Sequence, residues 1–267
     1  MTHPILISAC YTYPVKGMTA HAVDSLQLQP GQSVVGDRAF VFAFGNAEIL
    51  GAHGWVSKRQ SVTLLNTPYL ALVEAGWDPA ERVLSISLRG QSKSAQVDDP
   101  AARIDIAEWF TDVVLGLPEN PLRGRPEREP LRLLGDGESR FTDRGPTQIS
   151  LGGSASLADL TQYAGVDVDF RRFRLNFEVD DIEAWAEMDW VGKQARIGHD
   201  VVVDVTAPIQ RCNAINASPV GAGRDVELMH VLQRSYGHLN FGIEANVVSG
   251  GVIAVGDEVV IGQGLLT

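Results

Sequence analysis

Short strand-forming runs separated by glycine and proline make up most of this sequence, and this pattern limits how the chain can fold. Residues 5–12 and 38–44 are apolar runs rich in strand formers. Residues 69–77 and 82–88 flank Asp78-Pro79, a pair typical of turns, and therefore predict a hairpin. Strands this short and this closely spaced favour a small barrel or sandwich in the first half of the chain.

A helix is predicted where the strand pattern stops. Asp105 and Glu108 have the spacing of a capping box, an apolar stripe follows, and Gly116 ends it. The second half mixes both types of element. We expect helices at 156–163, with Ser156 as the cap, and at 226–235, and strands at 131–134, 172–179, 200–209, 241–248 and 252–261.

The charge balance limits the kinds of partner. The 22 lysines and arginines against 33 aspartates and glutamates give a formal charge of −11. A general nucleic-acid binder is not expected, because the mean field repels phosphate, although a local basic pocket for one small anion remains compatible. No apolar run reaches the ~18 residues of a spanning helix, and the start of the chain lacks a basic leader pattern. We therefore expect no membrane association and a cytoplasmic location.

The two cysteines exclude several metal centres. Cys10 and Cys212 cannot form a four-cysteine zinc site or a plant-type iron–sulfur centre. Cys10 lies inside an apolar strand and is expected to be buried. Cys212 directly follows a predicted strand and has Arg211 as its neighbour. An adjacent cation lowers a thiol pKa, so Cys212 is either a nucleophile or soft metal ligand, or a small buried hydrophobe.

Several basic residues are candidates for an anion site. Arg172 and Arg174 share one face of the predicted strand at 172–179, and Asn176 continues that face. These residues either form an anion pocket or pair on the surface with the acidic residues of 178–189. Lys16 lies on a turn shaped by proline and glycine, while Asp37-Arg38 and Lys58-Arg59 add further cations. Taken singly, these last charges are equally compatible with a solvated surface.

Seven short motifs follow one another in a fixed order. They are Tyr13-Pro14-Val15-Lys16-Gly17, Gly36-Asp37-Arg38, Phe141-Thr142-Asp143, Ala155-Ser156-Leu157-Ala158-Asp159-Leu160, Arg172-Phe173-Arg174-Leu175-Asn176, Arg211-Cys212 and Val255-Gly256-Asp257. In this order and spacing the chain resembles the MOSC superfamily with its N-terminal β-barrel partner domain. That superfamily includes the mitochondrial amidoxime reducing component and the C-terminal domain of molybdenum cofactor sulfurase. The resemblance covers nearly the whole chain.

This resemblance implies a molybdenum cofactor, which is a pyranopterin dithiolene that carries a phosphate. On the family's pattern Cys212 ligates the molybdenum, and Asp143 lies at the mouth of the metal site, where it positions substrate or passes a proton. The positions that hold the pterin and its phosphate fall on Lys16, Arg38, Arg174 and Asn176, with Arg211 beside the thiolate and Arg59 as a further candidate. Arg144 stands where relatives carry a small hydroxyl residue, and a cation there would grip the phosphate or narrow the mouth.

The expected fold is therefore β-rich α+β, with an N-terminal β-barrel domain at 1–118 and a MOSC β-barrel with a few helices at 119–267. The implied activity is a molybdenum-dependent oxidoreductase that reduces N-hydroxylated small molecules by oxo transfer. Two cysteines cannot build a ferredoxin domain, so we expect a separate electron-donor protein of the ferredoxin, flavoprotein or cytochrome type. The alternative is a cofactor carrier or sulfur-transfer module with a persulfide on Cys212. A barrel protein that has lost the cofactor is a third reading.

Overall fold

The computed structural model describes residues 3–32, 34–51, 54–138, 141–143, 148–221 and 223–262. Its strands are β1 (Ile5–Thr12), β2 (His21–Val23), β3 (Ser25–Leu28), β4 (Val41–Ala43), β5 (Glu74–Asp78), β6 (Val83–Leu88), β7 (Gln91–Gln96), β8 (Arg132–Leu134), β9 (Gln148–Gly153), β10 (Phe177–Asp180), β11 (Gln194–Ile197), β12 (Val201–Gln210), β13 (Asn240–Ser249), β14 (Gly251–Ala254) and β15 (Glu258–Gly262). The α-helices in these ranges are α1 (Pro100–Leu115), α2 (Ser154–Ala164) and α3 (Leu228–Tyr236).

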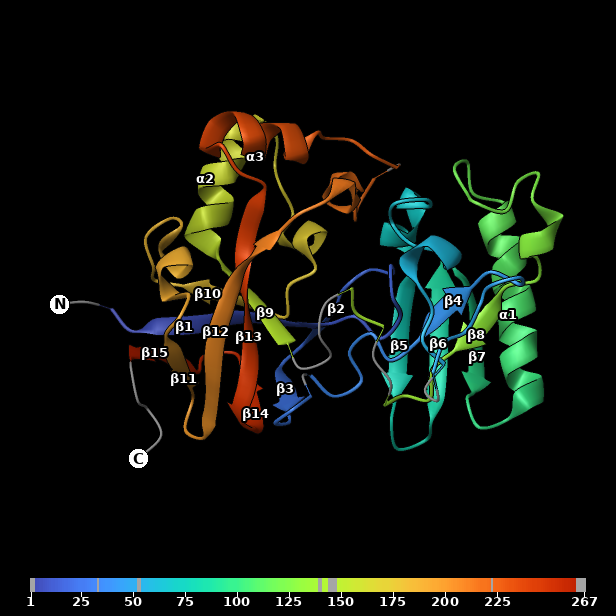
Figure 1. Ribbon diagram of the computed structural model, residues 1–267, viewed down its shortest axis with the longest axis horizontal. Coiled ribbons are helices and arrows are strands. Elements are labelled where there is room, and N and C mark those ends of the chain that lie inside the picture. Colours follow the sequence, from blue (N-terminus) through green and yellow to red (C-terminus); the bar gives the residue numbers. More distant parts are fainter. Residues whose placement is uncertain are drawn as a thin grey trace.

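A closed barrel occupies one side of the molecule (Figure 1). Its strands run in the order β10-β9-β13-β12-β11-β15-β1, and β1 pairs with β10 to close the ring. All neighbours are antiparallel except β9 and β10. Alternation along each strand points Ile149, Leu151 and Ile243 into the barrel core, while Gln148 and Ser150 face outward. The β-rich α+β fold class expected from the sequence is confirmed.

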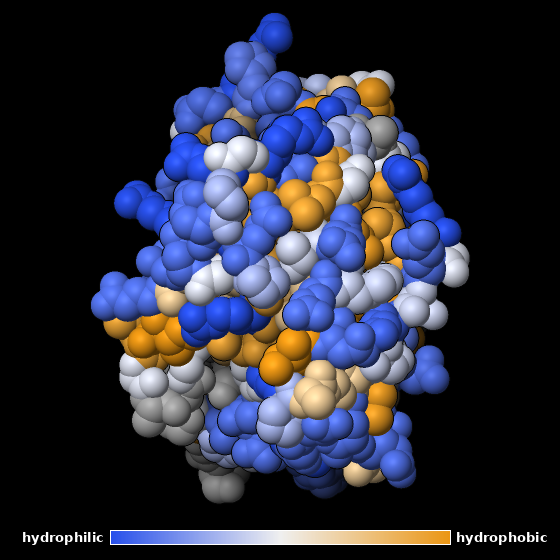
Figure 2. All heavy atoms as spheres, turned by 90° about the vertical axis from the view of Figure 1, so that its right-hand side faces the viewer, coloured by the Kyte–Doolittle hydropathy of each residue, from blue (hydrophilic) through white to orange (hydrophobic). Residues whose placement is uncertain are grey.

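The first lobe, built mainly from residues that precede the barrel strands β9 to β15 in the sequence, lies beside the barrel (Figure 1). It contains the β5-β6-β7 sheet, the β4-β8 pair and α1. Ile106, Phe110 and Val114 on α1 are buried in the core of this lobe. Figure 2 looks at its outer side, where hydrophilic residues predominate and apolar ones show between them in patches. The helix therefore packs with an apolar face inward and a polar face toward solvent.

The start of the chain belongs structurally to the barrel. β1 is one of the barrel strands, and β3 pairs with β14. Leu26, Leu28 and Val34 are buried in the same core cluster as the barrel interior. The division into domains at 1–118 and 119–267 stays a prediction. In the structure, the chain forms the barrel strand β1 before it enters the first lobe.

Several expected element limits are wrong, for local reasons. The helix α1 begins at Pro100, because the Asp99 side chain accepts from Ala101 N at 2.9 Å and proline is favoured in the first turn. Ser156 does not cap α2 and is buried within it, where its hydroxyl contacts Glu187 at 2.7 Å. Residues 68–72 form a 3-10 turn, so the hairpin strand expected at 69–77 begins only at Glu74.

The strand expected at 172–179 is also wrong in its first half. Phe170–Phe173 form a 3-10 turn capped by Asp169, and Arg174 takes a left-handed backbone with φ 55°. The strand β10 therefore starts at Phe177, and Arg172 and Arg174 do not share a strand face. Strands β7, β9 and β11 were not expected from the sequence.

The partly buried carboxyl group of Glu178 on β10 should make the stability of the fold depend on pH. Burial, and then the charges of Asp180 and Asp169, raise the pKa of Glu178 from 4.5 to about 7. The folded chain holds this proton more tightly than the unfolded chain, so the resulting stability is present below pH 4.5 and is lost as the pH rises through 7. Glu178→Gln should therefore raise the free energy of unfolding by roughly 1 kcal/mol at pH 8 and change it little at pH 4.5.

Urea denaturation at the two pH values measures this effect, and the exposed Glu81→Gln serves as the matched control. Equal effects of Glu178→Gln at both pH values would contradict the assignment.

Of the helices in the described part of the chain, none has the length and apolarity needed to cross a bilayer.

Candidate functional site

A cavity of about 460 Å³ is lined by residues of both lobes. Lys16, Lys58 and Thr63 line it from the first lobe and its connection, and Ser150 and Gln210 line it from the outer wall of the barrel. Seven of the residues predicted to form the site meet here. They are Lys16, Arg38, Asp143, Arg174, Asn176, Arg211 and Cys212. Residues separated by nearly 200 positions in the sequence thus face one space.

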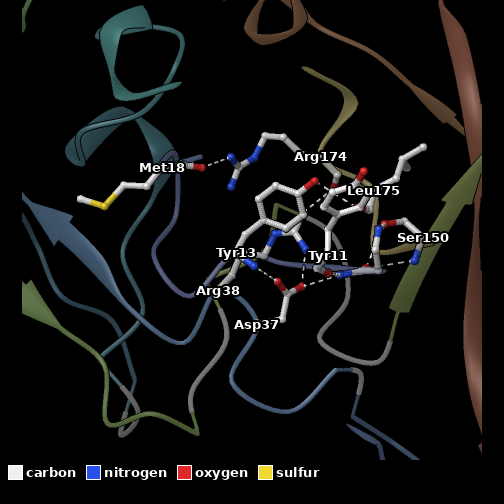
Figure 3. Close-up of polar contacts among 9 residues, drawn as sticks. Tyr11, Tyr13, Met18, Asp37, Arg38, Ser150, Arg174 and Leu175 are labelled. Atoms are coloured by element: carbon white, nitrogen blue, oxygen red, sulfur yellow. Dashed lines mark hydrogen bonds and ion pairs between the residues drawn. The ribbon is translucent and has the colours of Figure 1, made fainter. Parts of the chain in front are cut away.

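Two arginines stack against one buried tyrosine in the wall of this cavity (Figure 3). The guanidinium carbons of Arg38 and Arg174 each lie 4.4 Å from the centroid of the Tyr13 ring. Both arginines have a left-handed backbone, with φ 48° and 55°. Burial, and then the positive charge of Arg38, lower the pKa of Arg174 to about 10, so the Arg174 side chain stays cationic at neutral pH.

Backbone carbonyls and one carboxylate hold these arginines in position. Arg174 donates to Met18 O, and Arg38 donates to Arg174 O at 2.6 Å (Figure 3). Arg38 also forms an ion pair with Asp37, which is fully buried. Because the ring of Tyr13 is also buried, its pKa is raised and its hydroxyl stays neutral, donating to Leu175 O at 3.0 Å.

Asn176 helps to build the wall rather than offering its amide to the cavity. Its Nδ2 donates to Asp37 Oδ2 at 3.1 Å and to Tyr11 O at 3.3 Å. Its Oδ1 accepts from Ser150 Oγ at 3.0 Å. The amide therefore ties β10 to β9 and to the end of β1, next to the stacked arginines.

Asp143 lies between two lysines. Lys16 Nζ is 2.6 Å from Asp143 Oδ1, and Lys58 Nζ is 3.7 Å from Oδ2. Burial lowers the pKa of Lys16, and the carboxylate of Asp143 opposes that shift. Asp143 itself is half-exposed, as expected for a carboxylate at the mouth of a site.

Cys212 is exposed and Cys10 is buried. Cys212 comes two residues after the end of β12 and caps a 3-10 turn at Asn213–Asn216, in which Ile215 N donates to Cys212 O at 3.1 Å. Burial raises the pKa of the Cys10 thiol to about 12, so that sulfur stays protonated. Cys10 is therefore a small buried side chain of the core, whereas this interpretation does not apply to Cys212.

Arg211 and Arg172 fix the backbone around Cys212. Arg211 donates to Phe241 O at 2.8 Å and to Phe173 O at 2.7 Å. Arg172 is 5% exposed and donates to Ala217 O at 3.0 Å, beyond the turn that follows Cys212. The arginine beside the cysteine therefore supports the main chain with its guanidinium.

The cavity lining fits an anionic, phosphate-bearing cofactor. Six basic and two acidic side chains line it in the described ranges. Within the described part of the chain, three buried polar atoms of the lining have no hydrogen-bond partner: Thr63 Oγ1, Gln148 Oε1 and Arg172 Nε. Buried polar atoms are nearly always paired, so these atoms call for a ligand or water. The exposed sulfur of Cys212 offers one soft ligand to a metal.

Two predicted residues are not brought into this group. Arg59 is exposed and does not line the cavity, whereas its neighbour Lys58 does. Arg144 lies outside the described residues. Sequence reasoning missed Gln148, Ser150 and Glu244 as lining residues. The alternation of Gln148 and Ser150 with Ile149 and Leu151 was the available signal for the first two.

Comparisons with known proteins identify the domain that contributes most of the barrel. Residues 138–260 match the family model of the MOSC domain, and no curated protein matches the chain. The YuaD protein from Bacillus subtilis is 12% identical, with 97% of this chain and 96% of that chain covered, at a TM-score of 0.45. YiiM from Geobacillus stearothermophilus is 18% identical, with 43% of this chain and 54% of that chain covered, at a TM-score of 0.32.

A structure of a hypothetical protein is 15% identical, with 48% of this chain and 56% of that chain covered, at a TM-score of 0.33. At such TM-scores these three likenesses carry no argument about activity. The expected N-terminal β-barrel partner domain stays a prediction. The family model, together with the closed barrel, shows that residues 138–260 of this chain form a MOSC domain, a family linked to molybdenum-cofactor binding or sulfur transfer.

Proposed function

We propose that the chain is a molybdenum-cofactor-dependent oxidoreductase that reduces N-hydroxylated small molecules by oxo transfer. The observation that supports it best is the exposed Cys212 in the lining of a cavity that six basic side chains make cationic. The chain as a whole has a net charge of −11, so the charge of this cationic cavity is opposite in sign to that of the whole chain. When bound, the cofactor would supply two-electron oxo-transfer chemistry.

In this proposal the first task of the chain is to hold an anion. Arg38, Arg174 and Lys16 face the cavity as cations whose positions are fixed by Tyr13, Asp37 and Asp143. Preorganised guanidinium groups bind phosphate oxygens with little further ordering cost. Asn176 acts indirectly, by holding β10 against β9.

The second task is proton delivery. Reduction of an N–O bond to an N–H bond and water consumes two protons, and Asp143 is the half-exposed carboxyl of the cavity lining. Lys16 and Lys58 hold its carboxylate at the mouth, where it can take a proton from solvent and pass it inward. Electrons would come from a separate donor protein of the ferredoxin, flavoprotein or cytochrome type.

The test is expression in a host that makes the cofactor, followed by assays for metal, pterin and turnover. Near-stoichiometric molybdenum and pterin are expected, with oxidation of the dithionite-reduced protein by benzamidoxime. A metal that is present but does not respond to N-hydroxylated compounds would reject the reaction and keep the cofactor. Negligible metal and pterin would reject both.

The exposure of Cys212 also favours a second candidate, a cofactor carrier or sulfur-transfer module. An exposed thiol can carry a persulfide and meet a partner protein directly. Cyanide-labile sulfur that is lost in Cys212→Ala, or transfer of cofactor to an apo-enzyme, would favour this candidate. Neither would be expected of the oxidoreductase.

Arg174→Ala should weaken cofactor retention. It removes a guanidinium stacked on Tyr13, and a direct charge-assisted contact to phosphate is worth about 1.5–3 kcal/mol. Pterin content after gel filtration measures the effect. Arg171→Ala is the matched control, because Arg171 pairs with Asp169 and does not line the cavity. Unchanged occupancy in Arg174→Ala would remove this residue from the site.

A further inference from the structure

Two buried hydrogen-bond donors of the cavity lining take no part in the proposed anion site of Arg38, Arg174 and Lys16. Thr63 and Arg172 are 6% and 5% exposed, and both line the cavity. Thr63 Oγ1 and Arg172 Nε are buried, and neither atom has a hydrogen-bond partner among the residues that the structure describes. A buried donor without an acceptor destabilises the fold, and more so when the donor is charged. Such donors are rare unless a ligand or water completes them.

The two donors approach the cavity from different lobes. Thr63 precedes Leu64, which packs in the core of the first lobe, while Arg172 lies in the 3-10 turn before β10. Arg172 donates to Ala217 O, and Ala217 is buried in the same core cluster as Leu64. The loop that follows the Cys212 turn therefore connects the wall holding Arg172 to the wall holding Thr63.

The remaining donors of Arg172 are already engaged. Its Nη1 contacts Ala217 O at 3.0 Å and Asn216 O at 3.3 Å, and its Nη2 pairs with Asp225 at 2.7 Å. These contacts fix the guanidinium and leave only Nε for a ligand. Arg38 and Arg174, in contrast, belong to the cluster stacked on Tyr13.

We propose that Thr63 Oγ1 and Arg172 Nε form an oxyanion subsite between the two lobes, separate from the arginines stacked on Tyr13. A tetrahedral oxyanion of phosphate size offers several acceptors and accepts from both donors at once. Asp225 pairs with Nη2, but Nε is still a donor of a charged guanidinium, and such a donor favours an anionic acceptor over a water molecule. Arg172 donates to Asn216 O and Ala217 O at the end of the turn that Cys212 begins, so its side of this subsite lies toward the cysteine.

Two sources supply this chemistry, namely the phosphate of a bound cofactor and an anionic group on the substrate. The inference rests on the proposed function only for the identity of this natural oxyanion. The subsite itself is a property of the chain without cofactor, so inorganic phosphate is a sufficient probe.

The experiment is calorimetric titration of inorganic phosphate into the cofactor-free chain at constant ionic strength. Thr63→Val keeps the size of the side chain and removes only the hydroxyl, so it should weaken phosphate binding about tenfold, as expected for loss of one hydrogen bond to a charged group. Thr12→Val is the matched control, because Thr12 lines a different cleft, and it should bind phosphate like the wild type. Equal phosphate affinity in Thr63→Val and the wild type would overturn the proposal.

A second pair of variants separates anion binding from loop support. Arg172→Lys keeps a cation but loses Nε, and should weaken phosphate binding at least as much as Thr63→Val. Asp225→Asn weakens the ion pair that holds Arg172 while leaving Nε in place, so it should lower thermal stability more than phosphate affinity. If phosphate affinity instead follows stability across both variants, Arg172 only supports the loop and the subsite is rejected.

Titration of the cofactor-loaded chain distinguishes the sources. Loss of phosphate binding on loading assigns the cofactor's phosphate to this subsite instead of to the arginines stacked on Tyr13, and retained binding assigns the subsite to an anionic substrate. The metal content of Cys212→Ser is a separate measurement, so failure of the proposed function and failure of this subsite give different results.

Discussion

Cys212→Ser should reduce molybdenum-dependent turnover to background while leaving the fold unchanged. The proposed site has one soft protein ligand, and a serine hydroxyl is a hard donor that does not replace a thiolate on such a metal. The exposed position of Cys212 means that the exchange creates no cavity in a core. Metal content, pterin content and reduction of benzamidoxime measure the result on protein from a host that makes the cofactor.

The matched control for this variant is Cys10→Ala. Cys10 is 1% exposed in the barrel core, so its replacement should lower stability and leave metal content per folded chain unchanged. Surviving turnover in Cys212→Ser would show that the ligand assignment is wrong. Negligible metal in wild type and variant alike would favour a barrel protein without a cofactor.

Asp37→Ala should give the largest loss of stability, about 3–5 kcal/mol in the free energy of unfolding. The carboxylate is 0% exposed, accepts from Tyr13 N at 2.8 Å and Asn176 Nδ2 at 3.1 Å, and pairs with Arg38. Its removal leaves the Arg38 guanidinium, the Tyr13 N–H and the Asn176 amide without this acceptor in the protein interior. Urea denaturation measures the effect.

Pterin retention by the cofactor-loaded chain, measured after gel filtration, should weaken in Asp37→Ala as well, because Arg38 loses the partner that fixes it beside Tyr13. Asp98→Ala is the control: this exposed carboxylate pairs with Arg82 at 2.5 Å, and its loss should change stability little. An Asp37→Ala protein as stable as the wild type would show that the arginine cluster does not depend on this carboxylate.

The sequence predicted most long elements and the types of residue in the site, but not the local backbone. Periodicity located β1 and the hairpin of β5 and β6, because apolar runs bounded by turn residues are informative over this length. It failed at Arg174, whose left-handed backbone ends the 3-10 turn and whose side chain contacts Tyr13 and Met18, two residues far away in the sequence. β7, with the sequence Gln-Ser-Lys-Ser-Ala-Gln, has almost no apolar pattern and forms by pairing with β6.

For the candidate site, too, the sequence predicted which residues come together but not what each side chain does there. Motif order brought seven predicted residues to one cavity, yet it could not tell which donors face the space and which hold the wall. Asn176 was expected to contact the cofactor and is used within the wall, while Thr63 Oγ1 and Arg172 Nε have no partner among the described residues. Such distinctions depend on hydrogen bonds between residues more than 20 positions apart, which local patterns do not encode.

The placement of β1 has a consequence for synthesis on the ribosome. Its two barrel neighbours are β10, which begins at Phe177, and β15, which begins at Glu258. The strand that emerges first must therefore wait until nearly the whole chain is translated before both of its edges are paired. Pairings this distant in sequence make closure slow. The lobe built from β4 to β8 can fold in that interval, so the nascent chain would present one finished lobe tethered to a strand that pairs only with β2 at its end and is otherwise open to chaperones.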